Sequence, residues 1–458
     1  MSYERLAKPA VRPDRSLKSI TGHTYPEKSF VAYVTNAIRQ AGTNGTTSEL
    51  KPYLLKWATD TRMLRHAWNE LAANGGEAPG PNGRRYSDLE SEDVWTLLRS
   101  ISKSARLGMY APAPPKRVAI PKNIFRPELG TRELCLINIE DRALQRAIAT
   151  LLQPLVDPRL SDLVFGSRQR GRLHALAKLE QLAIVNGRWV WVIEDIRNAF
   201  DSVPRGQLKD VLARLVPSGE LIELIIKLVD NGQRHGVQQG GPLASMMLTV
   251  YLRIMLTRPW ARQQPMVPQF RYVDDTATVC RTKQEATESW NMQRQVLQSA
   301  GMQLKGCTAA SSTKDLRKGE PAIWLGFKLW KVGDSLKVGI ADKSWERLDG
   351  KLLLAHDEPN APLVAAATIK GWLDQMGPCY ASEDRPAVLD RIQEAASKLG
   401  YDELPTRDAL RMRWSRAHER WCELRETVNS PTAETFEEPP TRAEAEADQA
   451  EVPFNATP

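Results

Sequence analysis

The chain has 458 residues, of which 42% are hydrophobic and 26% are charged, an ordinary composition for a folded globular protein. No run of 18 apolar residues occurs, and the first 20 residues lack the apolar core of a signal peptide, so we expect a cytoplasmic protein with no membrane partner. The five cysteines form no CxxC pair, which argues against a zinc site and for a reducing compartment.

Charge is distributed unevenly along the chain. The segment from Pro431 to Pro458 holds seven acids and one base, so it carries −6, and the rest of the chain carries +14 of the overall +8. The acidic tail lacks apolar periodicity, and we expect it to be disordered. A body this basic predicts a polyanionic partner, although a basic surface that only promotes solubility is the alternative.

Periodicity predicts the first elements in chain order. The first 50 residues are polar and weakly patterned, whereas residues 50–73 have helical spacing of leucine, tryptophan and alanine. A Gly/Pro loop follows, then a helix at 87–105 that begins with a Ser-Asp capping signal. The further expected elements are a strand at Arg117–Lys122 and a proline-stopped amphipathic helix at Asn138–Pro158.

An apolar run followed by acids marks the first candidate site. Trp189 to Ile193 are all apolar, as in a buried central strand, and Glu194 and Asp195 follow at once. A carboxylate at the end of a buried strand is costly unless it is paired or binds metal. Taken alone, such an acid is more often a helix cap or a salt-bridge partner.

The stretch QFRYVDDTATV carries the second candidate site. Asp274 and Asp275 are adjacent in a strand-like run, although aspartate is depleted in strands and adjacent carboxylates repel each other. A hairpin tip is the simplest explanation, since aspartate tolerates turn geometry. Together with Asp195, the pair could hold two Mg²⁺ ions, which prefer oxygen ligands and stabilise the attacking and leaving oxygens of phosphoryl transfer.

At this point the chain resembles the reverse transcriptases. YVDD (Tyr272–Asp275) is similar to their signature, and seven further segments in the same order resemble the bacterial group II intron-like branch. These segments are PGPNG (79–83), YAPAPPKRVAIPK (110–122), residues 132–172, DIRNAFDSV (195–203), VQQGGPLASMMLTVYL (237–252), WLGFKL (324–329) and IKGWLDQMGPCY (369–380).

The resemblance implies an α+β right-hand polymerase fold with fingers, an antiparallel palm sheet with helices, and a helical thumb. It divides the chain into an N-terminal helical extension, fingers, a palm with the YVDD site and primer grip, the thumb and the acidic tail. The expected bounds are 1–75, 76–186, 187–335, 336–430 and 431–458.

The resemblance also assigns roles to residues, each by its match to a motif. Asp195, Asp274 and Asp275 are the expected catalytic and metal-binding carboxylates, with the carbonyl of Ile196 as a further metal ligand and Mn²⁺ as a substitute for Mg²⁺. The expected nucleotide contacts are Lys122, Arg132, Phe200 as a gate against ribose, Gln239 and Gly240, with Arg117 a weaker candidate; the expected primer grip is Trp324, Leu325 and Gly326.

Departures from the family pattern leave alternatives open. The segment between Lys122 and Arg132 is longer than the usual turn, and either Lys305 or Lys314 could be the lysine expected after GMQL (301–304). No endonuclease or RNase H-like module follows the thumb motif, which favours similarity to stand-alone enzymes, either defence-associated or unassigned.

Three functions follow. The first is an RNA-directed DNA polymerase that binds an RNA template, a DNA primer or product, deoxynucleotide triphosphates and a cognate noncoding RNA. The second is a template-independent or protein-primed DNA polymerase of the same fold. The third is a group II intron-type maturase that binds RNA.

Overall fold

The computed structural model describes residues 27–74, 78–167, 170–379, 385–402 and 405–429, in two compact units. The first unit contains residues up to Asp162, Ile196–Leu256 and Leu297–Gln303; the second contains Leu163–Asp195, Thr257–Val296 and the residues from Leu304 onward. The predicted disordered tail lies outside the described residues. No helix in these ranges is both long and apolar enough to cross a membrane.

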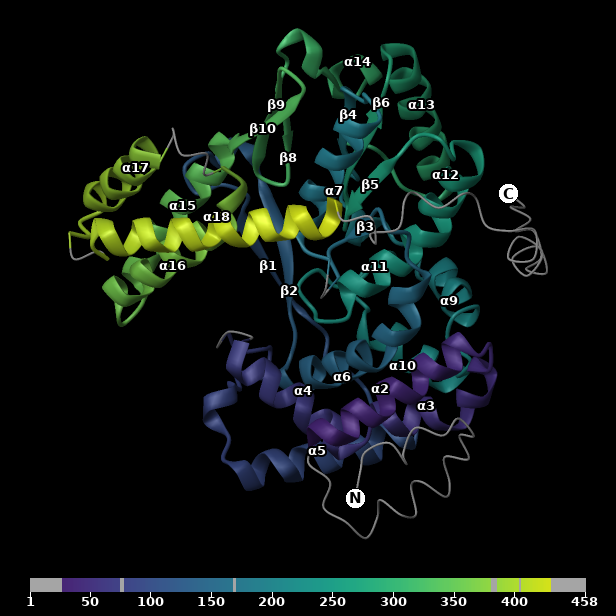
Figure 1. The fold of residues 1–458 in the computed structure, drawn as a ribbon. Helices are drawn as coiled ribbons and strands as arrows, with labels where there is room; N and C mark the ends of the chain where they lie inside the picture. Colours follow the sequence, from purple (N-terminus) through teal and green to yellow (C-terminus); the bar gives the residue numbers. More distant parts are fainter. Residues whose placement is uncertain (1–26, 75–77, 168–169, 380–384, 403–404, 430–458) are drawn as a thin grey trace, which may run out of the picture. The chain divides into compact units, whose positions relative to one another are not determined.

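The first unit is mainly helical, and its N-terminal helices gather around α6 (Figure 1). These helices are α2 (Glu27–Thr43), α3 (Lys51–Ala58), α4 (Thr61–Asn74), α5 (Ser91–Arg106) and α6 (Ile139–Val156). Almost every side chain of α6 from Ala143 to Val156 is buried, so this helix is the centre of the unit's core.

The helical character predicted for residues 50–73 is confirmed, but as two helices rather than one. The break lies where the Asp60 carboxylate accepts from the backbone N–H of Arg62 over 3.0 Å and the Thr59 hydroxyl donates to the carbonyl of Leu55 over 2.7 Å. Such local side-chain bonds compete with continued helix. The segment read as weakly patterned contains α2, whose buried Phe30 and Val34 lie one turn apart.

A hairpin and four short helices complete the first unit. Strands β1 (Lys116–Pro121) and β2 (Thr131–Leu136) pair antiparallel, so the strand predicted at 117–122 is confirmed within one residue. The helices are α8 (Ala199–Ser202), α9 (Arg205–Ala213), α10 (Gly219–Leu228) and α11 (Ala244–Leu252), the last continuing into a π-helical turn at Arg253–Thr257.

The second unit is built on a five-stranded sheet in the order β3-β5-β6-β4-β7. The strands are β3 (Val164–Phe165), β4 (Val190–Asp195), β5 (Gln269–Tyr272), β6 (Asp275–Cys280) and β7 (Thr313–Asp315), with helices α7 (Arg172–Val185), α12 (Arg258–Gln263), α13 (Lys283–Ser299) and α14 (Ala309–Ser312). Strand β4 is interior, as its apolar run predicted. The sheet is mixed rather than antiparallel, because β3 pairs parallel with β5.

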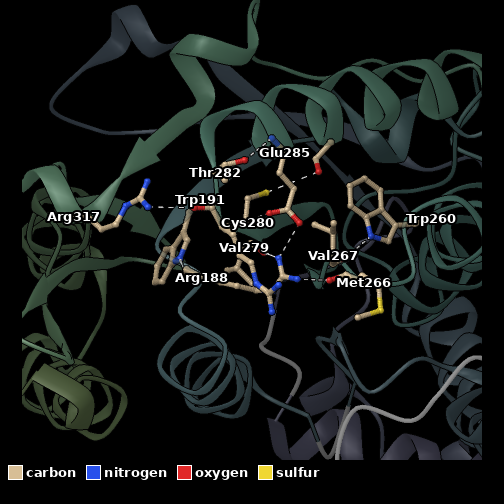
Figure 2. Close-up of polar contacts among 12 residues, drawn as sticks. Arg188, Trp191, Trp260, Met266, Val267, Val279, Cys280, Thr282, Glu285 and Arg317 are labelled. Atoms are coloured by element: carbon tan, nitrogen blue, oxygen red, sulfur yellow. Dashed lines mark hydrogen bonds and ion pairs between the residues drawn. The ribbon is translucent and has the colours of Figure 1, made fainter.

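A buried arginine fixes the start of β4 (Figure 2). Arg188 is 4% exposed; its guanidinium pairs with Glu285 of α13 over 3.0 Å and donates to the carbonyls of Val279 and Met266. The Trp191 indole N–H donates a hydrogen bond to the Arg188 carbonyl over 2.8 Å. A charge this buried needs such partners, and in satisfying them it ties β4 to β6 and α13.

A three-stranded meander and four helices follow the sheet. The strands are β8 (Ala322–Trp324), β9 (Phe327–Val332) and β10 (Ser335–Ile340), and the helices are α15 (Asp342–Leu354), α16 (Ala361–Gln375), α17 (Arg385–Lys398) and α18 (Arg407–Asn429). Helix α18 packs along α16 and α7 (Figure 1). The described part of the region expected as a thumb, 336–430, is therefore helical once β10 ends at Ile340, whereas its boundaries stay a prediction.

Candidate active site

The two adjacent aspartates lie at the tip of the β5–β6 hairpin. Tyr272 of β5 pairs with Asp275 of β6, so Val273 and Asp274 form the connecting turn. Val273 has φ +59°, a conformation that is costly for a β-branched residue. Its side chain also leaves no room for a Cβ at Gly166, which would approach Val273 Cγ2 to 2.8 Å. The hairpin tip expected from the sequence is thus a tightly constrained turn.

Asp195 lies directly opposite Asp275. The two residues are cross-strand partners at the last position of the β4–β6 ladder. Residues so paired in antiparallel strands have Cα atoms about 4.5–5.5 Å apart. Two segments 80 positions apart in the sequence therefore bring Asp195 and Asp275 to one end of the sheet.

Burial and mutual repulsion shift the ionisation of the hairpin acids. Burial raises the pKa of Asp274 to about 6, and the nearby charge of Asp195 adds to the effect. Burial likewise raises the pKa of Asp275 to about 7, helped by Asp274 and Asp195 and opposed by Lys343 and Lys305. A group of carboxylates that repel one another is the electrostatic setting in which a divalent cation binds well.

Lys305 contacts Asp195 twice. Its backbone N–H donates to the Asp195 carbonyl over 2.9 Å, and its Nζ lies 3.2 Å from Asp195 Oδ2. Lys314, the other lysine considered from the sequence, pairs in β7 with Trp191, four positions back along β4. Of the two, Lys305 is therefore the one at the carboxylates.

The described residues fit a divalent metal by their chemistry, although no group of three or more His, Cys, Asp or Glu side chains among them is already arranged around a common point. The candidate donors are all carboxylate oxygens, which Mg²⁺ prefers. One of them, on Asp195, is occupied by the Lys305 ammonium. Binding metal at this oxygen would require the lysine to move away.

The fingers candidates lie in the first unit. Lys122 and Arg132 are exposed on the β1–β2 hairpin, where the Lys122 N–H donates to the Gly130 carbonyl over 3.0 Å. Arg117, the weaker candidate, is already paired with Glu133 and lies 4.0 Å from Asp201. Lys122 and Arg132 are thus exposed to a ligand, whereas the Arg117 guanidinium is already engaged by Glu133.

The gate and Gln-Gly residues lie close to one another in the same unit. The Val237 N–H donates to the Phe200 carbonyl over 2.8 Å, and the Cys135 N–H of β2 donates to the Gln239 carbonyl over the same distance. Gly240 has φ +113°, a conformation that favours glycine. Ile196 is buried and opens the segment that leads to Phe200. The nucleotide-contact candidates therefore all lie in the first unit, and we call them the first-unit group: Lys122, Arg132, Phe200, Gln239 and Gly240. The three aspartates lie in the second unit.

The expected primer grip is the β8–β9 turn of the second unit. Trp324 is buried and pairs with Phe327, and its ring meets Phe270 of β5 edge-on, with centroids 6.2 Å apart. Leu325 and Gly326 form the turn with positive φ, and the Gly326 carbonyl accepts from the Ser344 hydroxyl. The turn is thereby packed onto the strand that leads into YVDD.

Two residues next to the aspartates were not predicted to have a role. Glu194, the acid that follows the apolar run, is in the structure a buried acceptor of three hydrogen bonds. Arg271 is fully buried beneath the hairpin tip and donates to the Val273 carbonyl. The only sequence signal for either was a charged residue inside an apolar strand.

Comparison with known proteins agrees with the resemblance. Residues 120–329 match the family described as reverse transcriptase (RNA-dependent DNA polymerase). Protein YkfC of Escherichia coli is 25% identical over 213 residues, which are 43% of this chain and 55% of YkfC. The group II intron-encoded protein LtrA of Lactococcus lactis is 25% identical over 191 residues, 38% of this chain and 31% of LtrA. The chain spans about half the length of the first relative and a third of the second.

Proposed function

We propose that residues 120–329, which match the reverse transcriptase family, form a reverse transcriptase domain of the group II intron-like type, and that the whole chain is an RNA-directed DNA polymerase that copies a noncoding RNA which it binds. The observation that carries the proposal is the pairing of Asp195 with Asp275 at the end of one sheet, beside Asp274 in the turn. All three lie within the matched residues.

In this proposal, the three carboxylates and the Ile196 carbonyl hold two Mg²⁺ ions. When bound, such ions stabilise the attacking and leaving oxygens of phosphoryl transfer. The support is the crowding of the acids. Burial and the neighbouring carboxylates raise the pKa of Asp274 and Asp275, and a bound cation would relieve that repulsion.

The first-unit group would bind the incoming nucleotide. Lys122 and Arg132 carry exposed cationic side chains suited to charge-assisted bonds with a triphosphate. Phe200 would exclude a ribose 2′-hydroxyl by the bulk of its ring. Gln239 and Gly240 would let the main chain approach the nucleotide closely, because glycine carries no side chain.

The second unit offers a basic groove for the backbone of the nucleic acid. The groove lies between α16 and α18 and is lined by four cations and Asp374: Lys370, Arg413, Arg416 and Arg420. Asp374 accepts from Arg413 and Arg420, which fixes those two side chains in place. Arginine binds phosphate in a bidentate manner, so the groove suits a template–primer backbone.

Two alternatives are separated by what the enzyme makes. A template-independent or protein-primed polymerase would yield homopolymeric or protein-linked DNA, and a maturase would bind RNA with no synthesis. The carboxylate group favours a polymerase over a maturase, because RNA binding alone needs no such acids.

The test is to sequence the nucleic acid that copurifies with the chain and to assay extension of a DNA primer on that RNA. A unique structured RNA with matching complementary DNA supports the proposal. Synthesis that ignores the template sequence, or no synthesis from any template, contradicts it. Protection of cells against phage, lost with Asp274→Asn, would support a defence role.

A further inference from the structure

Glu194 lies on the face of β4 opposite to Asp195, because neighbouring strand residues point to opposite faces. Its side chain is 5% exposed and accepts three hydrogen bonds. The Trp290 indole donates to Oε1 over 2.7 Å, the Ser312 hydroxyl donates to the same oxygen, and the Gly306 N–H donates to Oε2 over 3.1 Å. This buried charge is therefore fully engaged, and its removal would leave donors unsatisfied.

The bond to Gly306 requires a glycine at that position. A Cβ there would collide with the Glu194 carboxylate and the Ser312 hydroxyl. Since the backbone of Gly306 is held against Glu194, the preceding residue is held as well. That residue is Lys305.

Lys305 is consequently directed back over the end of β4. Its N–H donates to the Asp195 carbonyl over 2.9 Å, and the next N–H, of Gly306, donates to Glu194. The backbone is therefore held at two successive residues, 305 and 306. Its ammonium lies 3.2 Å from Asp195 Oδ2, with side-chain exposures of 63% for the lysine and 36% for the aspartate. A free surface pair of this exposure would be weak, but this one is positioned by the buried bonds behind it.

We infer that Glu194 is a positioning residue that places Lys305 on Asp195 as a built-in cation, and that a divalent metal must displace this lysine to bind Asp195 Oδ2. The inference rests on the proposed function only in taking Asp195 as a metal ligand. The lysine offsets the repulsion among the three acids while no metal is bound. The hydrogen bond from the Gly306 N–H to Glu194 therefore lowers the metal affinity of the site, because it keeps Lys305 on Asp195.

The test measures Mn²⁺ binding to the full-length chain by electron paramagnetic resonance, in the absence of nucleic acid and nucleotide. Lys305→Met keeps the length of the side chain and removes its charge, so we expect Mn²⁺ to bind about three- to tenfold more tightly. Unchanged or weaker binding by Lys305→Met overturns the inference, as does the absence of Mn²⁺ binding in both the wild type and this variant.

Glu194→Gln separates positioning from mere stability. An amide cannot accept from all three donors, so the 305–306 segment should loosen and Mn²⁺ should again bind more tightly. In the Lys305→Met background the same substitution should have no further effect. An equal effect of Glu194→Gln in both backgrounds overturns the positioning role.

Glu285→Gln is the matched control. Glu285 is also a carboxylate that anchors β4, but through Arg188 at the opposite end of the strand. This variant should leave Mn²⁺ affinity unchanged, and circular dichroism should confirm that all variants are folded. Because binding is measured without polymerisation, a wild-type chain that binds Mn²⁺ as expected yet copies no RNA would overturn the proposed function and leave this inference standing.

Discussion

The guanidinium of Arg271 donates to the carbonyl oxygen of Val273 over 3.1 Å, from a position in β5 where the arginine is 1% exposed. Val273 is the residue with φ +59° in the turn before Asp274. The arginine thus stabilises the conformation of the turn, and its charge opposes the rise in the pKa of Asp274. Burial lowers the pKa of Arg271 itself to about 10, still well above neutral, so it stays charged.

Arg271→Met should lower nucleotide incorporation by about tenfold or more, as is common when a residue supporting a metal site is lost. The reason is that the turn loses its bond and Asp274 its nearest buried cation. The measurement is single-nucleotide extension at saturating Mg²⁺ with folded protein. Full activity in the folded variant would show that the turn holds its shape unaided.

Asp195→Asn and Asp274→Asn should each abolish deoxynucleotide incorporation while RNA binding is retained. Both variants remove a negative oxygen from the candidate metal site at nearly constant volume. Asp334→Asn, in the exposed β9–β10 turn, is the matched control and should behave as wild type. Near-normal synthesis by both site variants would contradict the assignment.

Phe200→Ala should raise the incorporation of ribonucleotides relative to deoxynucleotides, because the ring that would meet a 2′-hydroxyl is gone. The measurement is competitive extension with paired nucleotides. Phe125→Ala, which removes an exposed ring between β1 and β2, should not change the ratio. If the ratio is also unchanged for Phe200→Ala, then the ring serves only in packing.

Arg416→Gln in the α16–α18 groove should weaken RNA binding and lower the slope of log affinity against log salt by about 0.7–0.9, the amount expected for one lost phosphate contact. A chain that ends at Ser430 should keep the wild-type slope and bind slightly more tightly at low salt, since it lacks the −6 tail. A slope that does not change in Arg416→Gln would place the RNA elsewhere.

The buried pair of Tyr110 and Asp141 predicts a pH-dependent stability. The tyrosine hydroxyl donates to Asp141 Oδ1 over 2.7 Å, and burial raises the pKa of Asp141 from 3.8 to about 6. The folded state therefore binds this proton more tightly than the unfolded state, so the stability contributed by Asp141 falls as pH rises from about 4 to 6.

Asp141→Asn should remove that loss. Relative to wild type, its free energy of unfolding should gain on the order of 2–3 kcal/mol between pH 4 and pH 7, measured by denaturant unfolding. Tyr110→Phe should steepen the wild-type dependence, because the bond that stabilises the carboxylate is lost. A pH-independent difference between Asp141→Asn and wild type would show that the acid is ionised throughout.

The features that could be predicted from sequence share a local cause. Strand β4 and the β5–β6 hairpin were readable because an unbroken apolar run and an acid pair each determine local structure. Helix α2 also carried a local signal, since its buried Phe30, Val34, Ile38 and Ala41 recur at helical spacing, although the polar residues between them make the segment look weakly patterned.

The site was only partly predictable for a related reason. The acids follow from their motifs, but the contact between Lys305 and Asp195 joins residues 110 positions apart. The residues that we infer to position it, Glu194, Gly306 and Ser312, carry no shared sequence pattern. Non-local hydrogen bonds of this kind leave no periodicity for a sequence reading to detect.

The pairing of Asp195 with Asp275 has a consequence for how this protein fails. Because side chains alternate along a strand, a slip of β4 by a single residue would turn Asp195 to the opposite face and bring Glu194 to the edge beside Asp275. A misregistered molecule would thus carry a glutamate where Asp195 normally faces Asp275 at the candidate metal site. If the chain is the proposed polymerase, its activity per molecule would report the fraction of chains in which β4 and β6 pair in the correct register.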